Sequence, residues 1–581
     1  MMDQKNLLLA IVISVVILVG FQYGFEFLKP PAQHTAATTG TPGTPAAQNA
    51  PVQTPAPGTT ATPAIAPTPG VPTSAAQAQT REAALASQPR LKIDTPRLHG
   101  SISLTGGRID DLTLATYHDT VDPSSPEVVL LDPTGTTDPY FAEFGWVAGS
   151  ADEKAKLPGP QTLWKGSGTL TPTTPVTLTW DNGEGLTFTR TVSVDTNYMF
   201  TLRDEVKNTG AAAANLVPYA LISRTGTPKT SGYYILHEGL IGELAGGLQE
   251  VKYASLKTGH PDEFSSTGGW MGFTDKYWLT ALVPPQTDAI KAQFRHTIDG
   301  GVDRYQTDYL GAPVAVAPGG TGEVSTRFFG GAKEVNLLDA YADSGIPRFD
   351  RAIDFGWFYF LTKPIFLALQ FIAGVLGNFG LAILLFTFCV KLLFFPLANK
   401  SYRAMSKMKL LQPQMQKLRE QYPDDKAKQQ TEIMALYKRV GANPLAGCLP
   451  IVIQIPVFFS LYKVLFVTIE MRHAPFYGWI HDLSAPDPTS FANLFGLIPF
   501  VPPHVLMIGA WPLIMGMTMF LQQKLNPQPV DPMQAKMFMV LPVVFTYMLS
   551  AFPAGLVIYW AWNNTLSVCQ QWVIMHRAGA A

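Results

Sequence analysis

The 581-residue chain is poor in charged residues and in cysteine. Asp, Glu, Lys and Arg make up 15 % of it, whereas ordinary soluble domains carry about 25 %. The net charge of −1 argues against a protein that grips nucleic acid through its overall charge. The three cysteines, Cys389, Cys448 and Cys569, all lie in apolar segments, which argues against a disulfide framework. A membrane protein is therefore the first class to test.

Motifs of the common enzyme classes are also missing from the sequence. It contains no Walker loop, no H-E-x-x-H, no G-x-S-x-G and no paired cysteine site. We therefore expect no catalytic residue, no metal site and no cofactor.

What the chain does have is a set of long uncharged apolar runs, and the first lies at the N-terminus. The 20 residues between Lys5 and Glu26 carry no charge, and this length spans about 30 Å of hydrocarbon. A cleavable signal peptide is the alternative, but its apolar region is usually about 7–15 residues long and no small-x-small site closes this run. We predict an uncleaved anchor at residues 1–29. Residues 30–89, rich in Pro, Ala and Thr, predict a disordered linker.

The segment from 90 to 345 has the pattern of a β-sheet. Apolar and polar residues alternate from Leu186 to Val194, and Phe200, Leu202 and Val206 repeat the period of two. Asp-Asn-Gly and Asn-Thr-Gly sequences supply turns between such runs. We predict an all-β sandwich domain whose stability comes from its core, because it contains no cysteine.

After Ile346 the chain becomes strongly apolar. Residues 346–379 predict an interfacial amphipathic helix with aromatic anchors that include Trp357 and Tyr359; one long span through this region is the alternative. Later uncharged runs, divided at Pro and Gly residues, predict five spans. With the N-terminal anchor they make six, and the five lie at about 380–398, 441–466, 505–523, 537–552 and 554–575.

The orientation of these spans follows from the basic residues of a short loop. Lys400–Arg439 holds ten Lys and Arg against four acidic residues, an excess that marks the cytoplasmic side of a membrane. Six spans then place both termini in the cytoplasm and the sheet domain on the other side. The span count and the charge rule thus agree.

Lys391 is the most informative single residue, because it lies inside a predicted span. It is about nine residues, or about 13 Å, from the polar boundary at Lys400. A cation at that depth costs at least about 2.5–3.5 kcal/mol unless water or a partner meets it, and no other predicted span contains an acidic residue. We predict a hydrated cavity open to the cytoplasm; a lysine that snorkels to the end of a shorter span is the alternative.

Other polar residues of the spans could line such a cavity. They are Thr387, Gln454, Asn563 and Asn564. Each alone is more typical of a helix–helix hydrogen bond. Together with an unpaired cation they indicate an amphiphilic groove.

Residues 400–440 predict a cytoplasmic helical hairpin that turns at Tyr422-Pro423-Asp424-Asp425. Met405, Met408 and Met415 follow helical spacing on its first arm. The simpler interpretation is that they pack against the second arm. The alternative is that flexible methionines offer an adaptable surface to hydrophobic clients. The basic face could meet lipid headgroups or ribosomal RNA.

Several stretches of the C-terminal region carry a resemblance to a known family. They are Thr387–Lys391, Phe395–Leu397, Lys407–Pro413, Met434–Lys438, Asn443–Pro450, Gln454–Pro456, Trp479–Ser484, Asp531–Met533 and Phe552–Leu556. They resemble the core of the YidC/Oxa/Alb family of membrane protein insertases over about Phe355–Arg577. With the anchor and the sheet domain, the chain resembles the Gram-negative type of this family, which has a large periplasmic domain.

The resemblance implies a five-span insertase core at 380–581 around a hydrophilic groove, closed outward and open to cytoplasm and lipid. Its central cation corresponds to Lys391, where many relatives have Arg; a lysine is a point charge that titrates more readily. A client-contacting aromatic pair falls on Tyr559 and Trp560, where the usual pattern is Tyr-Tyr. The outer domain is expected to be a β-supersandwich.

The resemblance also implies the function, location and partners. We expect an ATP-independent insertase and chaperone in the bacterial inner membrane, with the sheet domain in the periplasm. Its partners would be nascent membrane proteins, the lipid bilayer, the Sec translocon with its accessory subunits, and the ribosome. The short C-terminus after His576-Arg577 weakens the ribosome expectation, because a long basic tail found in some relatives is absent.

Two functions from other classes remain to be tested. A transporter would need a second gate and usually repeated helices, and we see no such repeat. A membrane-tethered sugar-modifying enzyme would place its activity in Arg90–Val335, where His237-Glu238 is the candidate pair.

Overall fold

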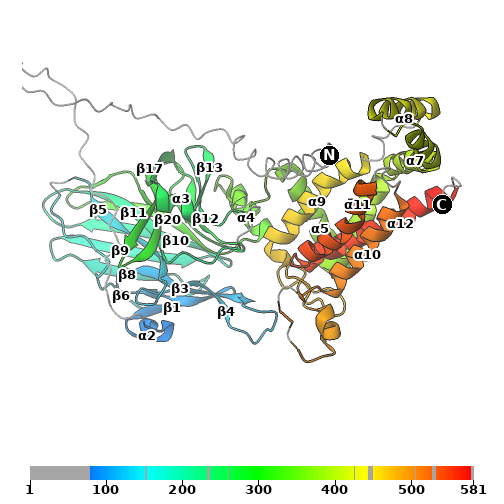
Figure 1. Ribbon diagram of the computed structural model, residues 1–581. Helices are drawn as coiled ribbons and strands as arrows, with labels where there is room; N and C mark the ends of the chain where they lie inside the picture. Colours follow the sequence, from blue (N-terminus) through cyan, green and yellow to red (C-terminus); the bar gives the residue numbers. More distant parts are fainter. Residues whose placement is uncertain are drawn as a thin grey trace, which may run out of the picture. The chain divides into compact units, whose positions relative to one another are not determined.

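The structure is a computed structural model that describes most of the chain after the linker. It describes residues 79–150, 153–231, 236–259, 261–423, 425–441, 449–500, 502–503, 506–526 and 532–577. The predicted anchor at 1–29 and most of the predicted linker at 30–89 lie outside these residues. In the described part, a β-sandwich domain precedes a helical C-terminal region (Figure 1), as the sequence predicts for the fold class.

Two sheets form the β domain, with twenty strands among the described residues. The first sheet runs β14-β17-β18-β11-β5-β3-β2-β1-β7, with β4 paired to β3 and β19 to β11. The second runs β13-β12-β15-β16-β20-β10-β9-β8-β6. Neighbouring strands are antiparallel except β1 and β7, which are parallel.

The strands of the first sheet are β1 Arg90–Asp94, β2 Leu98–Ser103, β3 Arg108–His118, β4 Glu127–Leu131, β5 Tyr140–Ala148, β7 Thr169–Leu170, β11 Ala214–Thr225, β14 Asp262–Thr267, β17 Ala289–Asp299, β18 Val302–Leu310 and β19 Val314–Val316. Those of the second are β6 Lys165–Gly166, β8 Val176–Asp181, β9 Leu186–Val194, β10 Met199–Asn208, β12 Gly239–Leu244, β13 Gly247–Lys252, β15 Trp270–Thr274, β16 Trp278–Val283 and β20 Thr321–Ala332. Short helices α3 (Tyr253–Thr258) and α4 (Val335–Asp343) and the turn η1 (Phe349–Ala352) complete the domain.

Strand β9 shows how the alternating sequence pattern becomes a sheet. Every second residue from Leu186 to Val194 is buried, and those between are half-buried. β10 pairs with it antiparallel, with Val192 opposite Leu202. The inward face of β9 is not wholly apolar, however, because Arg190 lies on it.

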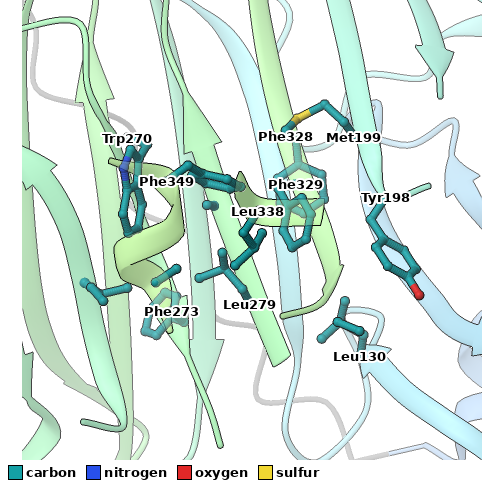
Figure 2. Packing of buried hydrophobic residues seen from close by; sticks show 14 of the residues in the cluster. Leu130, Tyr198, Met199, Trp270, Phe273, Leu279, Phe328, Phe329, Leu338 and Phe349 are labelled. Atoms are coloured by element: carbon teal, nitrogen blue, oxygen red, sulfur yellow. The ribbon is translucent and has the colours of Figure 1, made fainter. Parts of the chain in front are cut away.

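Aromatic rings fill the core of the domain (Figure 2). The Phe349 ring of η1 meets the Trp270 ring at a centroid distance of 5.2 Å and the Phe329 ring at 5.4 Å. Leu338 of α4 is fully buried in the same cluster. The segment that leaves the last strand is therefore part of the core and not a loose connection.

The predicted linker ends earlier than expected. Residues 81–86 form helix α2 (Arg81–Ala86), which is capped by the Thr80 side chain. Arg81 forms ion pairs with Asp111 and with Asp132 of the β domain. The prediction of disorder to residue 89 was thus wrong at this end, because it followed composition and missed a charged residue with two carboxylate partners.

The helical region contains eight helices among its described residues. They are α5 Tyr359–Leu376, α6 Phe379–Leu393, α7 Phe395–Gln421, α8 Lys426–Val440, α9 Leu449–Val467, α10 Ala510–Leu525, α11 Pro532–Leu549 and α12 Ala554–Arg577. Short turns η3 (Ile469–Met471) and η4 (Phe491–Gly496) lie between α9 and α10.

Length and apolar composition single out few of these helices as membrane spans. Within the described ranges α5 is long and apolar enough to cross a membrane, and α6 with α7 meets the same test as a pair bent by 69°. The segments Gln454–Val467 and Ala535–Leu549 are apolar but shorter. The predicted interfacial segment thus contains the helix that best fits a span, and the count of six stays a prediction.

The predicted span at 380–398 is not one straight helix. α6 ends at Leu393 and α7 begins at Phe395, so the first hairpin arm starts five residues before the predicted Lys400. Pro396 stands near the start of α7, a position where the missing N–H of proline does no harm. The sequence prediction read Pro396 as part of the span and missed this bend.

Candidate functional site

The structure holds Lys391 near the C-terminal end of α6, against α12. The side chain of Asn378 caps the start of α6 by accepting from Leu381 N at 3.0 Å. The Trp562 indole N–H donates to Leu384 O at 3.1 Å and ties α12 to α6. This contact sets the face of α12 that Lys391 meets.

A serine on that face receives the ammonium group. Lys391 Nζ donates to Ser567 Oγ at 2.7 Å, and Ser567 Oγ donates in turn to Asn563 O at 2.8 Å. The hydroxyl of Tyr402, on α7, also bonds Ser567. Among the described residues no carboxylate pairs with Lys391, so its partner is a neutral hydroxyl.

Lys391 opens into a cavity of about 50 Å³. α6, the start of α7, α9 and α12 contribute its walls. The lining is Phe386, Thr387, Val390, Lys391, Phe394, Leu397, Ala398, Tyr402, Gln454, Val457, Tyr559 and Asn563. One ammonium, two amides and two phenols thus lie among mainly apolar walls, which suits an amphiphilic segment.

Five of the residues predicted for the groove meet in this cavity. Lys391, Gln454, Tyr559 and Asn563 line it, and Gln454 hydrogen-bonds the Tyr559 hydroxyl. Thr387 lines it too, but its hydroxyl donates to Ile383 O of its own helix at 2.6 Å. Its polar hydrogen is therefore already engaged.

Two other predicted residues of α12 face away from the lining. The Trp560 ring packs on Phe458 at a centroid distance of 4.7 Å and on Phe545 at 6.1 Å. The Asn564 amide lies 3.5 Å from Thr518 Oγ1 of α10. Consecutive residues of a helix point about 100° apart, so Tyr559 lines the cavity and Trp560 does not; their joint contact with a client stays a prediction.

Helices α7 and α8 form a hairpin (Figure 1). An apolar seam lies between its two arms. Met415 is buried against Leu411 and Leu436, and the Tyr437 hydroxyl lies 3.4 Å from Met415 Sδ. Met408 packs at the edge of this cluster. Met405 is half-buried and is not a member of it. This packing accounts for Met408 and Met415 without a client.

The two aromatic anchors predicted before α6, Trp357 and Tyr359, have different surroundings. Trp357 is 72 % exposed. The hydroxyl of Tyr359, at the start of α5, donates to Asp350 and accepts from Lys363 Nζ at 2.8 Å. The Trp357 side chain is thus mostly exposed, whereas Tyr359 belongs to a polar cluster at the domain boundary.

In the β domain, His237 and Glu238 have structural partners. The His237 ring bonds Leu240 O at 2.9 Å through Nε2, and burial lowers the pKa of this ring to about 4. The Glu238 carboxylate accepts from the backbone N–H of Ser231 at 2.6 Å. This geometry gives the two residues no shared acid–base arrangement.

Sequence reasoning missed Ser567 and Tyr402. Ser567 lies four residues after Asn563 on the same face of α12, and helical spacing from Asn563 would have found it. Tyr402 had no such signal, because it reaches the site only through the bend between α6 and α7.

Two family descriptions match this chain. "YidC periplasmic domain" matches residues 90–368, and "60Kd inner membrane protein" matches residues 371–580. The chain is 55 % identical to the membrane protein insertase YidC of Bradyrhizobium diazoefficiens, over 100 % of this chain and 97 % of that protein. It is 54 % identical to the one of Methylorubrum extorquens, over 99 % of this chain and 96 % of that protein.

Solved structures give weaker likenesses. A crystal structure of an active YidC insertase with its first transmembrane domain resolved matches 83 % of this chain and 94 % of its own, with 17 % identity and a TM-score of 0.36. A galactose mutarotase related enzyme from Lactobacillus acidophilus matches 42 % of this chain and 97 % of its own, with 10 % identity and a TM-score of 0.30.

Proposed function

This chain belongs to the YidC family of membrane protein insertases, and from that premise we propose how it works. It is an inner-membrane protein with a periplasmic domain that inserts membrane proteins and, we propose, helps them fold. The polar flank of a nascent segment enters the cavity around Lys391 from the cytoplasm. The apolar part of the segment meanwhile passes along the helices into the lipid.

The observation that carries this proposal is the single hydrogen bond of Lys391. An ammonium group has three N–H donors, and among the described residues one of them has a partner, Ser567 Oγ. The other two are left for water or for an acceptor on the client. A carboxylate or carbonyl on the client flank fits them, and a carboxylate fits best because the bond is then charge-assisted on both sides.

The mechanism is a substitution of solvent. A polar group in hydrocarbon costs several kcal/mol if it has no hydrogen-bond partner. The cavity supplies partners, among them Lys391, Gln454 and Asn563, at a depth where the bilayer supplies none. Each stage of entry then exchanges one polar contact for another, which needs no ATP.

We also propose the finer topology and the partners. The membrane part has six spans with both termini and the hairpin of α7 and α8 in the cytoplasm, following the basic excess of Lys400–Arg439. The chain works alone or beside the Sec translocon and its accessory subunits, on segments delivered by ribosomes. The basic hairpin faces the side from which such segments arrive.

Substituting Lys391 by Glu tests the electrostatic step. We expect K391E to lower insertion of a single-span client with an acidic outer tail by about tenfold, because like charges now meet in the cavity. K391R should keep insertion, because it keeps the charge. K524E is the matched control, since Lys524 is exposed at the end of α10 and does not line the cavity.

The readout is protease protection of the client tail in cells depleted of the wild-type protein, at equal protein levels. Insertion by K391E as efficient as by K524E would remove Lys391 from the mechanism. Deleting residues 90–332 separates the insertase from the sugar-modifying alternative, because client insertion should survive in the insertase case.

A further inference from the structure

A second cavity lies beside the first and shares Lys391 with it. Its volume is about 440 Å³. The lining comes from α6, the start of α7 and the C-terminal half of α12: Phe388, Lys391, Leu392, Phe395, Asn399, Arg403, Leu566, Cys569, Gln570, Val573, Ile574 and Arg577. The proposed insertion step uses none of these residues except Lys391.

The charges of this cavity are all of one sign. Lys391, Arg403 and Arg577 line it, and no lining residue is acidic. In the part of the chain that the structure describes, no ion pair engages either guanidinium. Three cations around one cavity repel each other unless an anion joins them, so the cavity is built for a negatively charged group.

Two uncharged features of the cavity, the Gln570 amide and the N-terminus of α7, also favour an anion. Gln570 Nε2 is buried in the described structure without a hydrogen-bond partner, an unfavourable state that a bound acceptor would relieve. α7 begins at this cavity, with Phe395 and Asn399 in the lining, and no side chain caps its N-terminus. Helix N-termini favour anions through their free N–H groups and the helix dipole.

The flanks of the cavity are apolar and open. Leu392 is 62 % exposed, and Phe388, Phe395 and Val573 are each more than two-fifths exposed. Exposed side chains of this kind beside a cationic cavity match an amphiphile, with an anionic head and hydrocarbon tails. A nucleic acid offers no hydrocarbon for them.

We propose that this cavity binds one anionic phospholipid of the cytoplasmic leaflet. Arg403 and Arg577 hold the headgroup phosphate, which a guanidinium can bind through two parallel hydrogen bonds. Gln570 adds an amide donor to the phosphate. The acyl chains lie along Phe388, Leu392 and Val573.

The test measures lipid retained by the full chain. The protein is purified in detergent, mixed with phosphatidylglycerol or with zwitterionic phosphatidylethanolamine, and examined by native mass spectrometry. We expect the wild type to retain phosphatidylglycerol preferentially. The double variant R403Q/R577Q should bind it about thirtyfold more weakly, since each cation near a headgroup contributes about 1 kcal/mol.

A matched double variant controls for charge alone. K438Q/R439Q removes two positive charges from the exposed end of α8, outside the cavity, and should bind the lipid as the wild type does. Gln570→Leu should lower retention by a few-fold without altering charge. Equal loss in R403Q/R577Q and K438Q/R439Q would overturn the proposal, because it would reduce binding to a diffuse surface effect.

Soluble competitors separate the lipid from other anions. Glycerol 3-phosphate and inorganic phosphate share the headgroup chemistry but lack tails, so they should displace phosphatidylglycerol only at far higher concentration. An acidic client peptide should leave the lipid bound. Displacement by free phosphate at the lipid's own concentration, or by the peptide, would show that the cavity serves a phosphate or a client segment and would refute the lipid site.

Discussion

The β domain and the helical region treat a buried cation in opposite ways. Arg190 is fully buried in the sandwich. Its Nε donates to Asp204 Oδ1 at 2.6 Å, and its other nitrogens donate to Gly107 O at 3.0 Å and Phe144 O at 2.8 Å. Lys391 has a hydroxyl partner, Ser567, and a cavity.

The difference shows what each charge is for. A cation with a carboxylate and two carbonyls around it is complete within the fold, and it fixes the two sheets relative to each other. Lys391, by contrast, has one neutral partner among the described residues, and we propose that water or a client supplies the others. Buried charge alone therefore does not mark a functional site; the state of its partners does.

Removing Arg190, whose hydrogen-bond partners all lie within the β domain, should have the largest effect on stability. R190M leaves the Asp204 carboxylate buried without its partner, and we expect a loss of about 3–5 kcal/mol in the free energy of unfolding. Thermal unfolding of the purified chain, followed by tryptophan fluorescence, measures it. R203M is the control, because the Arg203–Glu323 pair is exposed and should contribute at most about 1 kcal/mol. Similar losses of unfolding free energy in R190M and R203M would show that burial of the Arg190–Asp204 pair adds no stability.

Glu470 is a buried charged residue whose hydrogen bonds are only half satisfied, and its effect on stability depends on pH. Its Oε1 accepts from Val335 N at 2.9 Å, whereas its Oε2 is buried without a partner among the described residues. Burial raises the pKa of this carboxyl to about 7, so the fold favours the protonated form. The stability that it contributes is complete below pH 4.5, its ordinary pKa, and is lost as the pH rises to about 7.

We therefore expect E470Q to be more stable than the wild type at pH 8, by about 3 kcal/mol, and equally stable at pH 4.5. The measurement is the unfolding temperature of both proteins at several pH values between 4.5 and 8. E263Q is the control, because Glu263 is exposed on β14. If the unfolding temperatures of E470Q and wild type differed by the same amount at every pH, the proposal that Glu470 is protonated in the fold would be wrong.

Removing Ser567, the hydrogen-bond partner of Lys391 in the described structure, should have the smallest effect. S567A deletes one hydrogen bond to a charged group, worth about 1–3 kcal/mol when no water replaces it. Because we propose that water enters the cavity and can replace the lost hydroxyl, we expect the unfolding temperature to change little and client insertion to fall about twofold. T565A is the control, since the Thr565 hydroxyl bonds Ala561 O of its own helix. A large loss of stability in S567A alone would mean that Lys391 is a structural cation like Arg190.

Local patterns carried much of the fold prediction. Strand β9 follows its alternation, and α7 ends at Gln421, one residue before the predicted turn at Tyr422. α12 begins at Ala554, inside the predicted Phe-Pro-Ala-Gly turn. These signals depend on residues that are close together in the sequence, so they can be recognised from one sequence alone.

Long-range pairings could not be predicted in the same way. Arg190 and Asp204 occupy inward positions of β9 and β10. Because both residues are charged, the sequence alone predicts that they face solvent. Their burial becomes clear only when the two strands are paired in register. Ser567 reaches Lys391 across 176 residues of sequence. The second cavity depends likewise on α7 and α12 meeting, which the bend at Phe394 makes possible.

The shortness of α6 has a consequence for the surrounding lipid. Its 15 residues rise about 22 Å, against about 30 Å of hydrocarbon in an ordinary bilayer. Hydrophobic mismatch of this size is relieved by shorter or more disordered acyl chains beside the helix, at a fraction of a kcal/mol per Å. We expect lipids with short or unsaturated tails to gather along α6, so that membrane composition would tune how readily this chain accepts its clients.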